Sequence, residues 1–289
     1  MESCFIFALL KQAGVKLFET GLKMRQTRAK KYLFTALIFF LFAFFSFAKT
    51  SDSANKKRGE QRKKSADLPR SIIPAKPTAK WTKVWWTDRH QAKLEKAQGG
   101  NVDFVMIGDS IIHAWETHGK RVWTQYYKPR KALNLGFSGD RTEHVLWRIQ
   151  HGEVDHISPK VVVLLIGTNN TAGNDSAKET VAGINAIVKE LKSRLPHSRI
   201  LLLAIFPRGE KPNTPLRKKN DAVNREIAKL ADQKQLFFLN INNRFFNKQK
   251  QLPSEIMPDF LHPNERGYRI WAEAMEPTLK RLLAMPPLK

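Results

Sequence analysis

The chain has 289 residues, of which 42% are hydrophobic, a content that suits a globular core. Its single cysteine, Cys4, excludes an intrachain disulfide and a cysteine-based metal site. The formal net charge of +24 is unevenly spread, because residues 1–98 carry 21 Lys and Arg against 7 Asp and Glu.

The N-terminal region has the pattern of a targeting segment. Residues 33–48 form an uncharged apolar run after a basic stretch and end in Ser46-Phe47-Ala48, which is typical of a signal peptide and its cleavage site. The run is short for a membrane span, which needs about 20 residues, but an uncleaved anchor stays open. Met24 begins a normal signal n-region, so residues 1–23 are expected to precede the true start. The protein is therefore expected to be exported, to the periplasm or outside the cell, with residues 1–48 as signal peptide or anchor.

Residues 49–79 predict a linker. They are polar and basic, then proline-spaced, with no apolar periodicity, which indicates a disordered or extended tether. Their positive charge favours contact with anionic envelope polymers or lipid headgroups, and a merely solvated linker is the alternative. No nucleic-acid partner is expected, and a homodimer stays open. The folded domain is predicted to span residues 80–289.

The domain begins with a predicted amphipathic helix and continues as alternating strands and helices. Trp81, Val84, Trp85 and Leu94 lie at roughly helical spacing, so a helix is expected over 81–97 with its aromatic residues in the core. Short apolar runs predict strands at 103–107, 131–135, 161–166, 200–205 and 236–239, and helical patterns cover 111–118, 140–151, 176–195, 215–233 and 264–283. This alternation predicts an α/β fold, a three-layer α/β/α flavodoxin-like domain whose five-stranded parallel sheet has the order 2-1-3-4-5.

Four short motifs stand out from this frame. They are Gly-Asp-Ser at 108–110, Gly-Phe-Ser-Gly-Asp at 136–140, Gly-Thr-Asn-Asn at 167–170 and Asp-Phe-Leu-His at 259–262. The first three follow the first three predicted strands. In open parallel sheets, ligands bind beyond the carboxyl ends of the strands, so these motifs are expected to share one site.

The motifs supply the groups that ester hydrolysis needs. Ser110 is the candidate nucleophile, His262 the base that removes its proton, and Asp259 the carboxylate that orients the imidazole. The oxyanion of a tetrahedral intermediate needs hydrogen-bond donors, for which the backbone N–H groups of Ser110 and Gly139 and the side-chain amide of Asn169 are candidates.

The roles expected of the other residues in these motifs are less specific. Asp109 is expected to hydrogen-bond neighbouring loops, and Asn170 to cap a turn. Ile111, Thr168 and Leu261 are candidates for the wall of a small acyl pocket, although Thr168 also suits a turn. No histidine and carboxylate cluster has metal-ligand spacing, so no metal is expected.

In this order, the four motifs resemble those of the SGNH (GDSL-type) hydrolase superfamily, whose four letters correspond here to Ser110, Gly139, Asn169 and His262. The similarity is closer to one branch, the catalytic subunits of platelet-activating-factor acetylhydrolase. It is carried by Ala-Leu-Asn-Leu-Gly-Phe-Ser-Gly-Asp at 132–140, His-Val-Leu-Trp-Arg at 144–148, 167–170 and Pro-Arg-Gly-Glu-Lys-Pro-Asn at 207–213. The resemblance covers about residues 100–285. It implies hydrolysis of small acyl esters by a Ser-His-Asp triad, without metal or cofactor.

This sequence differs from that branch in two features, and these limit which properties of the branch can be expected of this protein. Ser138 stands where the branch has glycine, which adds a polar group beside the expected oxyanion site. The signal sequence and basic tether are foreign to an intracellular subunit and indicate an exported bacterial relative, so the substrate of that branch is not carried over.

The expected function is hydrolysis of short acyl esters, above all acetyl esters, of carbohydrate or lipid-derived alcohols through an acyl-serine intermediate. The alternative is a catalytically silent module at the cell surface that binds glycans or esters. A binding role needs no nucleophile and base, so the presence of both favours the enzyme.

Overall fold

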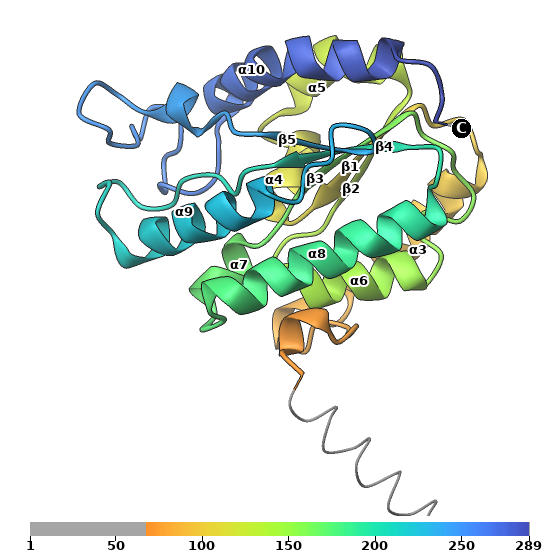
Figure 1. Ribbon diagram of the computed structural model, residues 1–289, viewed down its shortest axis with the longest axis horizontal. Helices are drawn as coiled ribbons and strands as arrows, with labels where there is room; N and C mark the ends of the chain where they lie inside the picture. The colour runs from red at the N-terminus through yellow and green to blue at the C-terminus, as the bar shows by residue number, and fades with distance from the viewer. Residues whose placement is uncertain (1–67, 289) are drawn as a thin grey trace, which may run out of the picture. The chain divides into compact units, whose positions relative to one another are not determined.

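Short apolar runs buried on both faces build a central parallel sheet. The computed structural model describes residues 68–288 and contains one five-stranded sheet in the order β2-β1-β3-β4-β5 (Figure 1). Its strands are β1 (Phe104–Gly108), β2 (Ala132–Gly136), β3 (Val161–Leu165), β4 (Arg199–Leu203) and β5 (Leu236–Leu239). All four neighbouring pairs are parallel. The predicted three-layer fold and strand order are confirmed.

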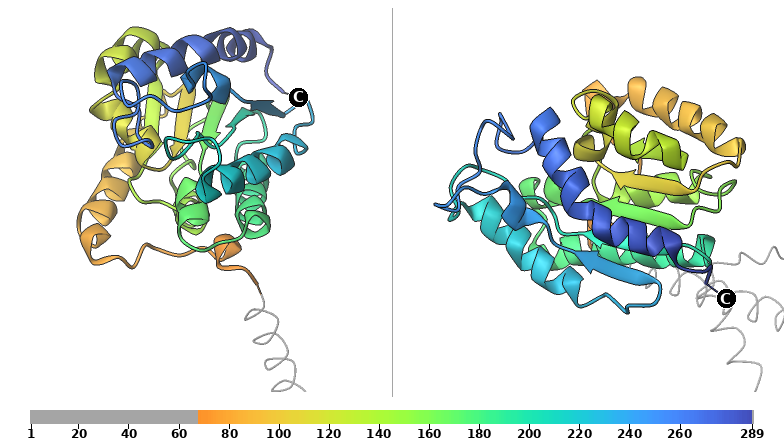
Figure 2. Two further views of the ribbon diagram at one scale, coloured as in Figure 1. Left: turned by 90° about the vertical axis from the view of Figure 1, so that its left-hand side faces the viewer. Right: turned by 90° about the horizontal axis from the view of Figure 1, so that it is seen from above.

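Helices cover both faces of the sheet. The α-helices are α3 (Trp85–Gln98), α4 (Ser110–His113), α5 (Lys120–Tyr126), α6 (Thr142–Gln150), α7 (Thr168–Ala172), α8 (Ala177–Arg194), α9 (Pro215–Ala228) and α10 (Glu265–Ala284). Five 3₁₀ turns join them: η1 (Arg70–Ile72), η2 (Lys80–Thr82), η3 (Ala114–Glu116), η4 (Lys128–Arg130) and η5 (Asn242–Phe245). Figures 1 and 2 show α5 and α10 on one side of the sheet and α6, α8 and α9 on the other.

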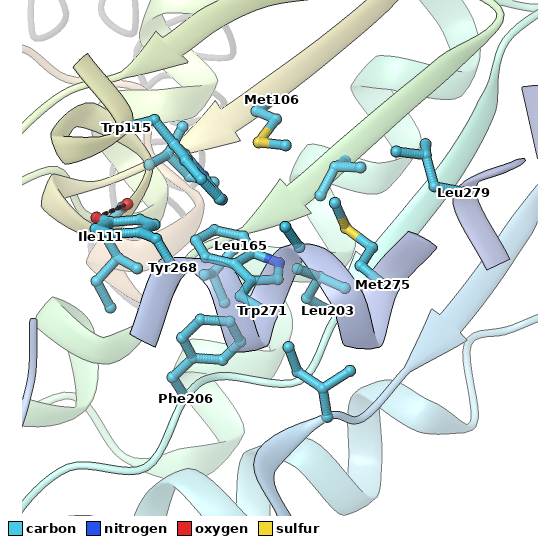
Figure 3. Packing of buried hydrophobic residues seen from close by; sticks show 14 of the residues in the cluster. Met106, Ile111, Trp115, Leu165, Leu203, Phe206, Tyr268, Trp271, Met275 and Leu279 are labelled. Atoms are coloured by element: carbon cyan, nitrogen blue, oxygen red, sulfur yellow. Dashed lines mark hydrogen bonds between the residues drawn. The ribbon is translucent and has the colours of Figure 1, made fainter. Parts of the chain in front are cut away.

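Alternation along each strand divides the core into two layers. Successive strand side chains point to opposite faces, so Phe104 and Met106 belong to one cluster and Val105 and Ile107 to the other. The first cluster includes the aromatic residues of α10, whose Trp271 packs among Leu165, Leu203 and Phe206 (Figure 3). The second cluster packs under α6, α8 and α9. The sheet is thus held rigidly, which fixes the ends of its strands.

The first helix buries a different face from the one predicted. Its buried positions are Trp86, His90, Lys93 and Ala97, which keep a helical spacing but lie one residue away from the predicted face. Trp81 precedes the helix and is 59% exposed, so the prediction that it belongs to the core is wrong. Adjacent tryptophans at 85 and 86 allow either register, and only packing against the domain decides between them.

The compact unit also begins earlier than the predicted boundary at residue 80. It starts at Leu68, and η1 packs on α6 and α8 (Figure 2). The buried Ser71 donates its hydroxyl to the carbonyl of Glu179 at 2.6 Å and accepts from Thr142 through its own carbonyl at 2.9 Å. Residues 68–79 are therefore part of the folded unit and not of a tether.

The remaining N-terminal predictions lie outside the described residues. These are the signal peptide or anchor at 1–48, the alternative start at Met24 and the linker up to residue 67. Within residues 68–288, no helix has both the length and the apolar content needed to cross a membrane.

Candidate active site

The turn after β1 presents Ser110. A Cβ on Gly108 would lie 2.1 Å from the carbonyl oxygen of Leu165, so only glycine allows β1 and β3 to approach here. The Asp109 carboxylate then accepts a hydrogen bond from the N–H of Ile111 at 2.9 Å and caps α4. On the other side, Tyr268 of α10 donates its hydroxyl to the Ile111 carbonyl at 2.7 Å (Figure 3). The turn that carries Ser110 is therefore fixed from both ends.

Three of the predicted residues form one hydrogen-bonded chain. The Ser110 hydroxyl lies 2.8 Å from Nε2 of His262, and Nδ1 of the same ring lies 2.6 Å from the Asp259 carboxylate. Ser110 and His262 are 152 positions apart in sequence, so the fold itself brings them together. With the ring tautomer that donates from Nδ1 to Asp259, Nε2 is free to accept the serine proton.

Backbone donors hold the carboxylate in place. The second oxygen of Asp259 accepts from the N–H groups of Leu261 at 3.1 Å and His262 at 2.7 Å. This loop geometry places Phe260 at a φ of +56°, a conformation that is uncommon for a bulky residue. Partial burial alone would raise the pKa of Asp259, but the donors from His262 and Leu261 outweigh it and lower that pKa. The carboxylate thus stays charged toward His262.

The second and third motifs lie beside the first. Gly139 follows β2 with a φ of +80°, which favours glycine. Asn169 is the second residue of α7, which follows β3, and it donates its side-chain amide to the Asp140 carbonyl at 2.9 Å. Because β2, β1 and β3 are neighbours in the sheet, the Ser110, Gly139 and Asn169 positions meet at its carboxyl edge. Such an arrangement can stabilise a developing oxyanion.

A buried ionic cluster lies behind the second motif. Asp140 accepts from the indole N–H of Trp86 at 2.7 Å and from Arg148 at 2.8 Å. Arg148 also forms an ion pair with the buried Glu153. Burial raises the pKa of Asp140 to about 7 in spite of Arg148. One guanidinium therefore pairs with two buried carboxyl groups, and it ties the loop of Gly139 and Asp140 to α6.

Burial acts in the same direction on Asp109. It raises the pKa of this carboxyl to about 7, and the nearby charge of Asp140 adds to the effect. Both groups lie under the site rather than in it, because each is almost completely buried. Asp109 was expected to hydrogen-bond neighbouring loops, whereas its carboxylate caps α4 through the N–H of Ile111.

Ser138, where the resembling branch has glycine, contacts His113. Its hydroxyl lies 2.9 Å from His113 Nδ1, and its N–H donates to the same nitrogen at 3.3 Å. Burial first, and the charge of Arg89 second, lower the pKa of His113 to about 4, so the ring is neutral at pH 7. A neutral ring accepts at Nδ1, which lets it orient the loop of Gly139. Sequence reasoning gave His113 no role.

Two of the three predicted pocket residues do not line a pocket. Ile111 is 1% exposed and packs in the core, and Thr168 is 2% exposed, so neither presents a surface. These two assignments are wrong, because Ile111 packs in the core beside the end of β1 and Thr168 is buried at the start of α7. Leu261 does line a groove of about 480 Å³, together with Arg208, Thr214, Leu216 and the catalytic-loop residues Asp259 and Phe260.

Asn170 has a structural role. Its side chain accepts from the N–H of Thr142 at 2.9 Å and donates to Glu143 and Asp175, so it joins α7 to α6. Across residues 68–288, no three His, Cys, Asp or Glu side chains gather closely enough to hold a metal ion.

Trp81 is, after His113, a second residue at the site to which the sequence gave no functional role. Its indole packs so tightly on Gly139 that a Cβ there would lie 2.5 Å from the ring. The two residues are 58 positions apart, and no local pattern connects them.

Comparison with known proteins agrees with this geometry. A family model described as the GDSL-like Lipase/Acylhydrolase family matches residues 106–270. Platelet-activating factor acetylhydrolase IB subunit alpha1 of Homo sapiens is 37% identical over 200 residues, which cover 69% of this chain and 84% of that protein. The alpha2 subunit of Rattus norvegicus is 35% identical over 206 residues, covering 70% of this chain and 86% of that protein.

Solved structures share the fold at lower identity. A GDSL-like lipase from Bacteroides thetaiotaomicron aligns with a TM-score of 0.56 and 20% identity, covering 66% of this chain and 97% of that one. The acetylxylan esterase Axe2 from Geobacillus stearothermophilus aligns with a TM-score of 0.51 and 19% identity, covering 65% and 96%. The family match spans more than half of the chain and includes the turns of Ser110, Gly139 and Asn169 as well as His262. The chain therefore belongs to the GDSL-like lipase/acylhydrolase family and is an acylhydrolase.

Proposed function

We propose that this acylhydrolase cleaves short acyl esters, above all acetyl esters, through an acyl-Ser110 intermediate. As the Ser110 hydroxyl attacks the ester carbonyl carbon, His262 takes its proton at Nε2, and Asp259 stabilises the imidazolium. The C–O bond of the ester then breaks, and the alcohol leaves with the proton from His262. Water attacks the acyl-serine in the same way, with His262 again as base, and releases the carboxylic acid and free Ser110.

Three hydrogen-bond donors are assigned to stabilise the negative charge that develops on the carbonyl oxygen. These are the backbone N–H groups of Ser110 and Gly139 and the amide of Asn169. In the free enzyme the Asn169 amide donates to the Asp140 carbonyl, which holds it in place before substrate arrives. Donors that need no reorganisation stabilise the transition state more than they stabilise the substrate.

The hydrogen-bonded chain Ser110–His262–Asp259 is the observation that carries this proposal. A fluorophosphonate probe tests it directly, because it reacts only with an activated serine. The folded protein should be labelled at Ser110, and Ser138→Ala should be labelled like the parent. Absence of labelling in folded protein would support the silent binding module instead.

We expect Asn169→Ala to lower kcat by about 10²- to 10³-fold while KM changes little, because the lost donor acts on the transition state. Steady-state kinetics with p-nitrophenyl acetate measure both constants. The melting temperature should stay close to that of the parent, since Asn169 is only partly buried and makes one side-chain hydrogen bond. A rise in KM at constant kcat would contradict the assignment. Gly139→Ala is less informative, because its Cβ would also displace Trp81.

The preference for acetyl rests on the close packing around the nucleophile. Ile111 is buried directly beside Ser110, and Leu261 lines the groove beside Asp259, so bulky apolar side chains lie next to both the nucleophile and the base, which favours a small acyl site over a long channel. In a p-nitrophenyl ester series we expect kcat/KM to fall at least about tenfold from acetyl to octanoyl, which is the lower end of the change that one methylene causes in a hydrophobic pocket. A kcat/KM that rises through octanoyl would contradict an acetyl site. The alcohol is proposed to be carbohydrate or lipid-derived.

Export is part of the proposal. The apolar run at 33–48 and its basic flank support a secreted or membrane-anchored enzyme, with the basic arm near anionic envelope polymers or lipid. Mass spectrometry of the mature N-terminus distinguishes cleavage near residue 49 from an intact anchor. Recovery of the full-length protein only from the cytoplasm would exclude both.

A further inference from the structure

An exposed tryptophan stands at the wall of the active site. Trp81 is 59% exposed, although its indole edge packs on Gly139, the residue assigned to the oxyanion donors. A single exposed hydrophobic side chain is common in folded proteins, but this one lies against Gly139 at the carboxyl edge of the sheet. Its position at the reacting end of the sheet therefore points to a role in contacting substrate.

The indole is held in place by other aromatic rings. Trp81 stacks on Trp85 with a centroid distance of 5.8 Å and an interplanar angle of 19°. Trp85 in turn lies 5.8 Å from the ring of His113, which bonds to Ser138 in the loop of Gly139. One face of Trp81 is thus covered by Trp85 and one edge lies against Gly139, while 59% of the residue stays exposed to solvent. A preorganised ring of this kind loses little conformational entropy when a ligand binds.

The open surface suits the alcohol part of an ester better than the acyl part. An acetyl group is too small to use a whole indole face, and the alcohol is the only larger part of an acetyl ester. Between the two proposed alcohols, the surroundings favour a sugar. The exposed large hydrophobic side chains within residues 68–288 are Leu68, Ile73, Trp81 and Val84, and among them only Trp81 is aromatic and offers a flat ring face.

A sugar ring matches this surface chemically. A pyranose has a flat face of C–H groups and a rim of hydroxyl groups, so its face can stack on an indole while its rim stays hydrated. The exposed Lys80 and Lys83 flank Trp81 and offer hydrogen-bond donors to such a rim. We propose that the open face of Trp81, supported by Trp85 and set against Gly139, is a subsite for a sugar ring of an acetylated glycan. This inference rests on the proposed ester hydrolysis and names the class of alcohol.

Kinetics on two acetyl esters test the subsite. For each variant, kcat/KM is measured with an acetylated xylo-oligosaccharide and with methyl acetate, and the ratio of the two is compared. We expect Trp81→Ala to lower this ratio about tenfold, at the upper end of what one aromatic contact contributes, and Trp81→Phe to restore part of it. Val84→Ala is the matched control, because Val84 is 73% exposed in the same segment but does not stack. Its ratio should equal that of the parent.

Binding to inactive protein separates this inference from the proposed function. In the Ser110→Ala background, calorimetric titration with the acetylated xylo-oligosaccharide should give a Kd that Trp81→Ala weakens about tenfold. An unchanged ratio and an unchanged Kd in Trp81→Ala would overturn the subsite, even if Ser110 proves to be the nucleophile. If Trp81→Ala lowers kcat/KM for an acetylated ether phospholipid but not for the acetylated xylo-oligosaccharide, the assignment to a sugar is wrong. If no acetyl ester is hydrolysed but the titration still depends on Trp81, the proposed function fails and the subsite stands.

Discussion

Ser110→Ala should lower kcat/KM for p-nitrophenyl acetate by about 10⁴-fold or more, because no other group can form the acyl intermediate. His262→Ala should cost a similar factor, since an unassisted serine hydroxyl is a poor nucleophile. The double variant should be no slower than either single variant, because two residues that act as one unit lose their effect together. Rates of the three variants, measured at enzyme concentrations high enough to detect the residual reaction, provide the test.

Two further variants serve as controls for this result. His156→Ala changes an exposed histidine and should leave the rate unchanged. Asp259→Asn should lower kcat/KM less than Ser110→Ala does. The Asp259 side chain is 54% exposed, so water can partly replace its contact with His262. If the losses from Ser110→Ala and His262→Ala simply multiply in the double variant, the two residues do not act on the same step, and the proposed mechanism is wrong.

The sheet and the catalytic chain could be predicted from the sequence because their signals are local. Runs such as 161–165 are apolar throughout, and only a parallel sheet covered on both faces buries such strands completely. The motifs with Ser110, Gly139 and Asn169 each follow a strand, so the strand order alone brings them to one edge. Asp259 and His262 are three positions apart and bond within one loop.

The features that the sequence did not indicate depend on contacts between distant segments. Trp81 and Gly139 meet only after α3 has packed, and the pattern at 81–97 wrongly favoured a core position for Trp81. Short helices such as α5 and α7 carry too few residues for a periodic pattern. Ile111 looked like a pocket residue because it follows the nucleophile, but the burial of a side chain follows from packing and not from its place in a motif.

Arg148→Met should destabilise the domain by about 3–5 kcal/mol, because it removes the guanidinium that Asp140 and Glu153, two buried carboxyl groups, share. Methionine fills a similar volume, so the loss reports mainly on charge and hydrogen bonds. Arg148→Lys keeps the charge but not the planar guanidinium that reaches both carboxyl groups, so its free energy of unfolding should fall less than that of Arg148→Met. Urea unfolding at pH 7 gives the free energy of unfolding for the three proteins. Equal stability of Arg148→Met and the parent would mean that the cluster does not support the fold.

The stability of the same variant should depend more strongly on pH than that of the parent. Burial already raises the pKa of Asp140 to about 7 and raises that of Glu153, and removing Arg148 takes away the cation that opposes this rise. A carboxyl group whose pKa is higher in the folded than in the unfolded state binds its proton more tightly when folded, so it favours folding at low pH. The deficit of Arg148→Met should therefore be smaller at pH 5 than at pH 8. The Asp140 carbonyl also accepts from Asn169, the proposed oxyanion donor. Arg148→Met holds Asp140, and through it Asn169, less firmly. This variant should therefore have a lower kcat than the parent even at pH 5, where it recovers stability.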